Sequence, residues 1–266
     1  METKHAKVVI LCGGRGVRFH EATEATPKPL IEIGEKPILW HIMKTYAHYG
    51  YKDFVLCLGY KGDVIKKYFI DYQLAASDFT IELGNNARTK FHTRPEEQGW
   101  KITLVETGLN AMTGARIKRA EKYIDSDIFM LTYGDAVSDV NIQKLVEFHQ
   151  AHGKIGTVTA VHPLSRFGEL RVEKSKCNTV REFREKAVIH GDYINGGFFV
   201  FDQRLFDYIN SRDDCVFEGK PLEQLAGDRQ LAAYLHNGYW QCMDTYRDWQ
   251  ALNKDWESDR PPWKVW

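Results

Sequence analysis

Two short apolar runs with a helix-like segment between them constrain the fold of this chain most. Residues 7–12 and 53–58 are dominated by Val, Ile and Leu, as in strands buried on both faces of a parallel sheet. Residues 37–50 begin with Pro37, carry apolar side chains at helical spacing and end at Gly50, which predicts a helix. Strand, helix and strand together predict a βαβ unit, with a right-handed crossover.

This pattern continues through the first half of the chain and then changes. Two further strands are expected at 101–106 and 127–133, and further helices at 64–72, 113–124 and 141–152. After residue 152, closely spaced strands are expected at 156–161, 169–173, 179–183 and 193–201. We therefore expect a doubly wound, Rossmann-like α/β fold, with a mixed, mainly parallel sheet, helices on both faces and a small additional β region. No linker or repeat interrupts the sequence, which predicts a single domain, residues 1–266.

Charge and cysteine content exclude several classes of protein. Lys plus Arg and Asp plus Glu number 36 each, so no net charge attracts nucleic acid or an anionic membrane. The five cysteines include no C-x-x-C pair, which argues against disulfides and a cysteine zinc site. No apolar run is long enough to span a bilayer. We expect a cytoplasmic protein with neither a nucleic-acid nor a membrane partner.

A glycine- and arginine-rich segment, residues 13–18 (GGRGVR), follows the first predicted strand. Glycines allow a sharp turn and let backbone N–H groups approach phosphate oxygens, while Arg15, Arg18 and the proline-flanked Lys28 add positive charge. This combination predicts a triphosphate site. No Gly-Lys-Ser/Thr follows, as a Walker loop requires, and Phe19 replaces the third glycine of the dinucleotide fingerprint. An ordinary glycine-rich turn with solvated arginines stays open as the alternative.

Two acidic residues, Asp135 and Asp244, are candidates for binding a metal ion. Mg²⁺ is commonly held by one or two carboxylates, with phosphate oxygens and water completing its shell. Asp135 ends a predicted buried strand, and ligands of open α/β sheets bind beyond such strand ends. Taken alone, a turn at Gly134-Asp135 and a helix N-cap at Asp244 are the commoner explanations.

Several motifs, in order along the chain, resemble the signature of the sugar nucleotidyltransferases, and in particular that of the glucose-1-phosphate cytidylyltransferases. These motifs are residues 11–18, 27–29, 35–37, 38–44, 59–62, 112–114 with Arg116, 132–135, 166–168, 194–199, 243–245 and 262–264. The resemblance implies that an NTP, specifically CTP, and glucose 1-phosphate are joined with Mg²⁺ as cofactor, giving CDP-glucose and pyrophosphate. No protein nucleophile is needed, because the sugar phosphate is itself an anion that can attack the α-phosphorus in line.

The resemblance also assigns roles to individual residues. Catalysis would fall to Arg15, Arg18 and Lys28, and Mg²⁺ to Asp135 and Asp244. The nucleotide would contact Leu11, Gly13, Gly14, Gly16, Thr113, Arg116 and Gly134, and the sugar phosphate would contact Lys186, Asn195 and Gly196. Alternatives stay open for three of these sites: a solvated lysine at Lys186, a solvent-facing helix arginine at Arg116, and a β-bulge at Gly196-Gly197.

Some residues depart from the family pattern. Val17 replaces a threonine, Ala115 and Ala136 replace glycines, Ala187 replaces a proline after Glu185-Lys186, and Glu169 adds an acid. These changes leave the exact sugar and base open. The same chemistry with another NTP or another phosphorylated substrate is therefore one alternative, and a non-catalytic nucleotide-sugar-binding regulatory protein is another.

Two further alternatives find less support. An NAD-dependent oxidoreductase would need an acid at the end of the second strand, where Leu58-Gly59-Tyr60 stands. His149 and His152 share a helical face but lack a third ligand for zinc. The resemblance also implies a homo-oligomer. The N-terminal half is expected to bind the nucleotide, and the C-terminal half to bind the sugar and make the oligomer contacts, with its tryptophans, Trp249 to Trp266, as the expected contact.

Overall fold

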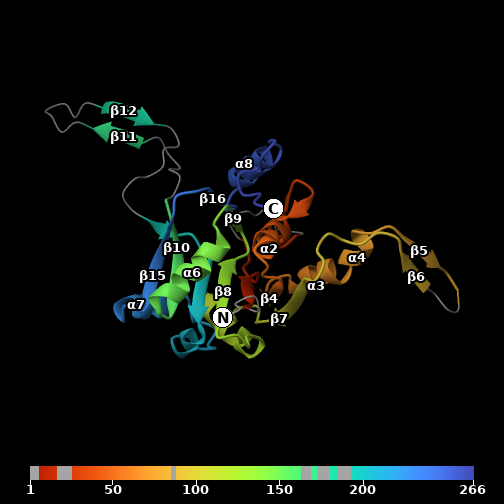
Figure 1. The fold of residues 1–266 in the computed structure, drawn as a ribbon, viewed down its shortest axis with the longest axis horizontal. Helices are drawn as coiled ribbons and strands as arrows, with labels where there is room; N and C mark the ends of the chain where they lie inside the picture. Colours follow the sequence, from red (N-terminus) through yellow and green to blue (C-terminus); the bar gives the residue numbers. More distant parts are fainter. Residues whose placement is uncertain (1–5, 17–25, 85–87, 163–168, 173–179, 185–192) are drawn as a thin grey trace.

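The computed structural model describes residues 6–16, 26–84, 88–162, 169–172, 180–184 and 193–266. Its centre is an eight-stranded sheet in the order β13-β10-β14-β8-β1-β4-β7, with β15 also paired to β10 (Figure 1). The strands are β1 (Val8–Leu11), β4 (Asp53–Leu58), β7 (Lys101–Glu106), β8 (Ile128–Tyr133), β10 (Gly156–Val161), β13 (Ile194–Asn195), β14 (Phe199–Asp202) and β15 (Leu231–His236). β7, β4, β1 and β8 run parallel, while β14 is antiparallel to both β8 and β10. The predicted mixed, mainly parallel sheet is confirmed.

Helices cover both faces of this sheet. They are α2 (Ile38–His48), α3 (Gly62–Ile70), α4 (Tyr72–Ala75), α5 (Thr113–Ala120), α6 (Ile142–His152), α7 (Lys220–Gly227) and α8 (Tyr246–Trp256), with short 3-10 helices η2 (Lys28–Leu30), η3 (Glu121–Tyr123) and η4 (Gln203–Asp207). Alternate residues of β1 enter two separate apolar clusters, because successive strand side chains point to opposite faces. Ile10 packs with α2 and α6, and Val9 packs with α5 and α7.

Most of the predicted elements agree with the structure, and two differ. The predicted strand at 193–201 is divided into β13 and β14, because Gly197 and Phe198 between them have φ angles of 74° and 47°, in the left-handed region. The predicted helix at 64–72 is α3 followed by the short α4. Both differences concern irregular backbone, which hydrophobic periodicity does not report.

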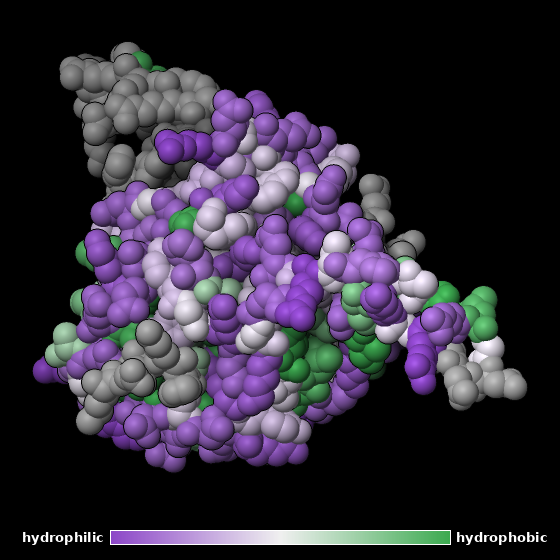
Figure 2. Space-filling model, turned by 45° about the vertical axis from the view of Figure 1, so that its right-hand side comes forward, coloured by the Kyte–Doolittle hydropathy of each residue, from purple (hydrophilic) through white to green (hydrophobic). Residues whose placement is uncertain are grey.

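Four two-stranded sheets accompany the central sheet. They pair β2 (Glu32–Ile33) with β3 (Lys36–Pro37), β5 (Phe79–Glu82) with β6 (Arg88–Phe91), β9 (Ala136–Ser138) with β16 (Trp240–Cys242), and β11 (Glu169–Val172) with β12 (Val180–Arg184). The sequence analysis did not predict β5–β6. This hairpin extends away from the central sheet and carries exposed apolar side chains, among them Ile81 and Leu83 (Figure 2).

The C-terminal tryptophans pack against their own chain. Trp263 is fully buried, and its indole Nε1 donates a hydrogen bond to His41 Nδ1 on α2 at 3.4 Å. Trp256 and Trp266 also contact the ring of His41. The cost of exposed indoles, which was the reason to expect an oligomer contact here, therefore does not arise at Trp263. The homo-oligomer itself stays a prediction. Among the described residues, none of the helices has both the length and the hydropathy needed to cross a bilayer.

Candidate active site

A cavity of about 380 Å³ lies beyond the carboxyl ends of β1 and β8. Ten of the predicted site residues line it: Leu11, Gly13, Gly14, Arg15, Gly16, Lys28, Thr113, Arg116, Gly134 and Asp135. A larger hollow of about 860 Å³ between η2, α3 and α8 is lined by none of the predicted site residues that the structure describes. The smaller cavity is therefore the candidate active site.

Lys28 and both predicted metal ligands meet at this cavity. Lys28 Nζ donates hydrogen bonds to Asp135 Oδ2 at 2.6 Å and to Asp244 Oδ1 at 2.7 Å. Asp135 lies between β8 and β9, and Asp244 follows β16. Because β16 pairs with β9, with Cys242 opposite Ala136, the two acids lie at the same end of this strand pair. The helix-cap alternative for Asp244 is wrong, because Thr245 is the N-cap of α8 and forms a capping box with Asp248.

The carboxylates of Asp135 and Asp244 keep Lys28 protonated. Burial alone would lower the pKa of Lys28, but the nearby carboxylates of Asp135 and Asp244 outweigh it and leave the pKa raised. The lysine side chain is only 12 % exposed, and the two carboxylates are 31 % and 23 % exposed. One cation is thus shared by two partly buried acids, which leaves the three groups with a net negative charge.

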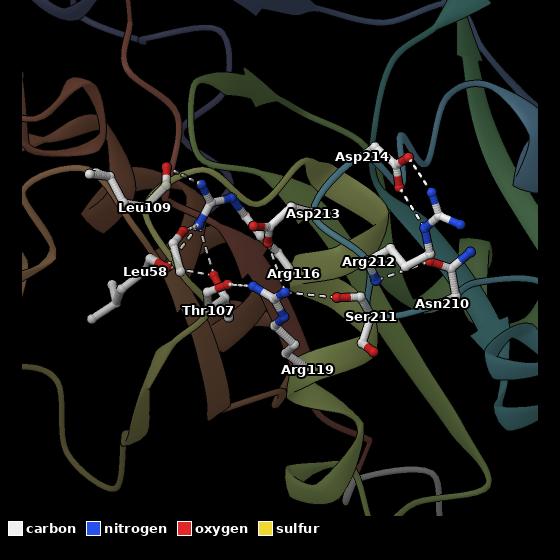
Figure 3. A network of polar contacts seen from close by, with 11 residues as sticks. Leu58, Thr107, Leu109, Arg116, Arg119, Asn210, Ser211, Arg212, Asp213 and Asp214 are labelled. Carbon is white, nitrogen blue, oxygen red and sulfur yellow. Dashed lines mark hydrogen bonds and ion pairs between the residues drawn. The ribbon is translucent and has the colours of Figure 1, made fainter.

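Arg116 is buried beneath the cavity and donates its hydrogen bonds to the protein itself. Its guanidinium donates to the Leu58 carbonyl oxygen at 2.9 Å and to Thr107 Oγ1 at 2.8 Å (Figure 3). It also donates to the carbonyl oxygens of Gly108 at 2.8 Å and Gly13 at 3.0 Å. Burial lowers the pKa of Arg116. The alternative of a solvent-facing helix arginine is therefore wrong. Arg116 holds together the loops that follow β1, β4 and β7, and its predicted contact with the nucleotide stays a prediction.

The glycines next to Arg116 have a steric reason to be glycine. A Cβ atom added at Gly13 or at Gly59 would overlap the Arg116 guanidinium. Gly14, by contrast, has no heavy atom within 4 Å of such a Cβ, and Gly16 has a φ of 61°, which glycine adopts readily. Arg15 is at the rim, where Nη2 donates to Asn110 Oδ1 at 3.2 Å.

Of the predicted sugar-binding residues, Asn195 is hydrogen-bonded to Tyr133, which lines the cavity, while Asn195 and Gly196 are not among the lining residues. Asn195 Nδ2 donates to Tyr133 Oη at 3.2 Å, and Asn195 Oδ1 accepts from the Gly197 N–H at 2.9 Å. Gly196 is buried. Its backbone N–H donates a hydrogen bond to the Thr159 carbonyl, and its carbonyl oxygen accepts one from Trp240 Nε1. The alternative at these glycines was a β-bulge. The structure instead has a break between two strands, with β13 ending at Asn195 and β14 beginning at Phe199. Arg18 and Lys186 lie outside the described residues.

Two residues at the site carried no role in the sequence analysis. Tyr133 lines the cavity and donates to Glu218 Oε1 at 2.7 Å, and Thr113 Oγ1 donates to Glu218 Oε2 at 2.6 Å. Burial and the Glu218 carboxylate raise the pKa of Tyr133. Tyr133 belongs to a quoted motif and could have been considered. Glu218 lies in a segment without a motif, so only the tertiary structure identifies it.

Other features of the sequence have a structural explanation. Ala115 and Ala136 are buried in the interior and are not among the residues that line the described cavity. The two alanines therefore give no reason to expect an altered ligand. His149 Nδ1 and His152 Nε2 both contact Thr157 Oγ1, at 2.9 and 2.7 Å, which joins α6 to β10.

Comparison with known proteins identifies the family of this chain. Residues 7–257 match the family model described as nucleotidyl transferase. A glucose-1-phosphate cytidylyltransferase from Salmonella typhi is 48 % identical over 261 residues, which cover 98 % of this chain and 99 % of that protein. A mannose-1-phosphate guanyltransferase from Gibberella zeae is 28 % identical over 245 residues, covering 91 % of this chain and 62 % of that protein.

A solved structure supports the fold. The crystal structure of HddC from Yersinia pseudotuberculosis has a TM-score of 0.68 at 22 % identity, covering 95 % of this chain and all of that one. A glycine loop after β1, paired acids beside the central sheet and a family match along nearly the whole sequence therefore agree, and the chain belongs to the nucleotidyl transferase family.

Proposed function

We propose that this protein transfers a cytidylyl group from CTP to glucose 1-phosphate, giving CDP-glucose and pyrophosphate. The observation that carries the proposal is the meeting of Lys28, Asp135 and Asp244 beside a cavity lined by the glycine loop. Such an arrangement combines backbone N–H groups and a cation for phosphates with two carboxylates for a metal ion. The choice of CTP and glucose 1-phosphate is supported by the 48 % identity to the Salmonella typhi enzyme.

The acid pair has the chemistry that a divalent cation needs. Asp135 and Asp244 each place an oxygen within 2.7 Å of one positive charge, the Lys28 ammonium, so both already converge on a single cation. We propose that these two carboxylates hold Mg²⁺, with phosphate oxygens and water as its other ligands. When bound, Mg²⁺ would neutralise phosphate charge and polarise the α-phosphate.

The residues of the chain would position the two substrates for in-line displacement. A phosphate oxygen of the sugar phosphate attacks the α-phosphorus of the NTP, a new P–O bond forms, and the bond to the β-phosphate breaks as pyrophosphate leaves. The loop of Gly13 and Gly14, together with Arg15 and Lys28, would hold the leaving pyrophosphate and spread its charge. Asn195 would orient the sugar. Catalysis then consists of positioning and charge neutralisation.

Pyrophosphate release tests the proposal. The purified protein would be assayed with Mg²⁺ and each of the four NTPs, crossed with a panel of sugar 1-phosphates. We expect release with CTP and glucose 1-phosphate, lost in Asp135→Asn and retained in the control Asp207→Asn, an exposed acid on η4. Release with a different pair only would overturn the substrate assignment. No release with any pair would overturn the enzyme assignment and favour the regulatory alternative.

The assembly state is a separate proposal. We propose a homo-oligomer, because the family resemblance implies one. Light scattering at two protein concentrations would test this, and a mass of 30.8 kDa at both would contradict it.

A further inference from the structure

A series of hydrogen bonds connects Thr113, a predicted nucleotide contact that lines the cavity, with Asn195, a predicted sugar contact, and Glu218 lies at its centre. One carboxylate oxygen accepts from Thr113 Oγ1 at 2.6 Å, and the other accepts from Tyr133 Oη at 2.7 Å. Tyr133 Oη in turn accepts from Asn195 Nδ2 at 3.2 Å. Thr113 begins α5, Tyr133 ends β8 and Asn195 ends β13, so one side chain joins three elements.

The carboxylate fixes the direction of every hydrogen bond in this series. An ionised carboxylate only accepts, so both hydroxyls must donate their single proton to Glu218. The lone pairs of Thr113 Oγ1 then accept from the Phe217 N–H at 2.9 Å, and those of Tyr133 accept from Asn195. Because the Gly197 N–H donates to Asn195 Oδ1, both ends of the Asn195 amide are assigned. These two hydrogen bonds use one N–H and one oxygen lone pair of the Asn195 amide. The second N–H and the second lone pair therefore point in fixed directions, in which a ligand could bind.

The backbone that carries Glu218 is bound along α5, so the exposed side chain starts from a fixed position. Arg119 on α5 donates to the Ser211 carbonyl at 2.7 Å and forms an ion pair with Asp213 at 2.8 Å (Figure 3). The Cys215 carbonyl accepts from the first N–H groups of α5, those of Gly114 at 2.9 Å and Ala115 at 3.2 Å. These contacts occupy the helix end with protein groups and hold residues 211–218 against it.

We propose that Glu218 is a positioning residue of the transfer reaction: it orients Asn195 toward the sugar through Tyr133 and holds Thr113 at the nucleotide end. The inference rests on the proposed function, because Asn195 must contact the sugar for the series to matter. Glu218 contacts neither substrate in this proposal. It acts on Asn195 and Thr113 by fixing the direction of the hydrogen bonds between them.

Glu218→Gln changes this direction with almost no change in shape. The new amide NH₂ cannot accept, so one of the two hydroxyls loses its acceptor. When that hydroxyl is Tyr133, its hydrogen bond from Asn195 Nδ2 is weakened, and only the Gly197 N–H still orients the Asn195 amide. We expect the KM for glucose 1-phosphate to rise about tenfold, as the loss of one hydrogen bond to a charged group would produce, while kcat falls less than threefold. The matched control is Asp214→Asn, an exposed acid in the same segment that pairs with Arg212 and should leave both values unchanged.

A double-mutant cycle with Asn195→Ala separates a positioning role from a general structural one. If Glu218 acts through Asn195, Glu218→Gln should change the KM for glucose 1-phosphate by less than twofold once Asn195 is alanine. Equal effects of Glu218→Gln in both backgrounds, or no effect in the native protein, would overturn the proposal while CDP-glucose synthesis stands. If Glu218→Gln does not fold, Tyr133→Phe takes its place in the cycle with the same expectation. A native protein that releases no pyrophosphate with any substrate pair would instead overturn the proposed function, and the role of Glu218 with it.

Discussion

Lys28 and Asp135, 107 positions apart in the sequence, meet with 2.6 Å between Nζ and Oδ2. The same ammonium lies 2.7 Å from Asp244 Oδ1, so it is paired with both carboxylates of the proposed metal site. A divalent ion bound between these acids would take over the role of the lysine and free it for a phosphate group. The geometry thus links metal binding to the position of Lys28.

Lys28→Met tests this link through stability. Without the ammonium, two partly buried carboxylates face each other, and we expect the metal-free protein to lose about 1–3 kcal/mol of unfolding free energy. Mg²⁺ should then raise the melting temperature of Lys28→Met more than that of the native protein, because the acids need a new cation. Thermal unfolding with and without Mg²⁺ measures both effects. Lys66→Met, which removes an exposed ion pair with Glu106, is the control, and equal responses of both variants to Mg²⁺ would contradict the link.

Asp244→Asn should lower kcat by more than about 100-fold, because several kcal/mol of charge stabilisation depend on the proposed metal ligands. Folding should change little, since Lys28 keeps Asp135 as a partner. Steady-state pyrophosphate release and thermal unfolding measure the two quantities. A variant that keeps more than a tenth of native turnover at saturating Mg²⁺ would remove Asp244 from the metal site.

Gly59→Ala should destabilise the protein by about 1–3 kcal/mol, because the added methyl group overlaps the Arg116 guanidinium. Arg116→Ala removes the overlapping group, so Gly59→Ala should cost much less stability in the Arg116→Ala background. Unfolding in urea of the two single variants and the double variant gives the interaction energy. Additive losses would show that Arg116 is not what requires glycine at position 59.

Acid should destabilise the protein through His41. Its Nε2 lies 3.0 Å from the Ile33 carbonyl and must donate, while Nδ1 accepts from Trp263, so the ring is the neutral tautomer. Burial lowers the pKa of His41 to about 4, below its unfolded value of 6.5. Between these values the unfolded chain binds more protons, so the stability contributed by His41 is present above pH 6.5 and is lost as the pH falls toward 4.

The expected loss is about 3 kcal/mol for this one group. Urea unfolding of the native protein and of His41→Gln at several pH values between 4 and 7 measures it. The variant should show a shallower dependence on pH. His149, whose pKa is also lowered to about 4 by burial, remains in both proteins and should contribute equally to both curves. Parallel curves for the two proteins would contradict the assignment to His41.

The parallel half of the fold was predictable because its signals are local. Residues 54–58 form an uninterrupted apolar run, and the structure has β4 at Asp53–Leu58. Asn141 was predicted to begin a helix, and it caps α6 through its side chain. Strands close to β11 and β12 were also predicted, but the strands of the other small sheets were not. β9 and β16 are three residues each and exist because they pair across about a hundred positions of sequence, which no periodicity in either segment reports.

The residues of the candidate site likewise differ in how far the local sequence predicts them. The residues of the glycine loop adjoin one another in the sequence and could be grouped from it. Arg116 could be named from the sequence, but its role could not be deduced, because its partners include the Leu58 carbonyl at the end of β4 and the Gly13 and Gly108 carbonyls after β1 and β7. Glu218 could not be named at all, since its partners Thr113 and Tyr133 are more than 80 positions away.

The C-terminal segment also determines when the site can exist during synthesis. Trp249 Nε1 donates to the Glu32 carbonyl at 2.9 Å, and Asn253 Oδ1 accepts from the Gly34 N–H at 2.9 Å, so α8 packs on the strand pair that follows η2. Asp244 directly precedes this helix. A nascent chain can therefore assemble its parallel strands early, but it lacks half of the acid pair until residue 244 has been added. A ribosome that stops before that codon releases a product with a glycine loop and no partner for its proposed metal ligand.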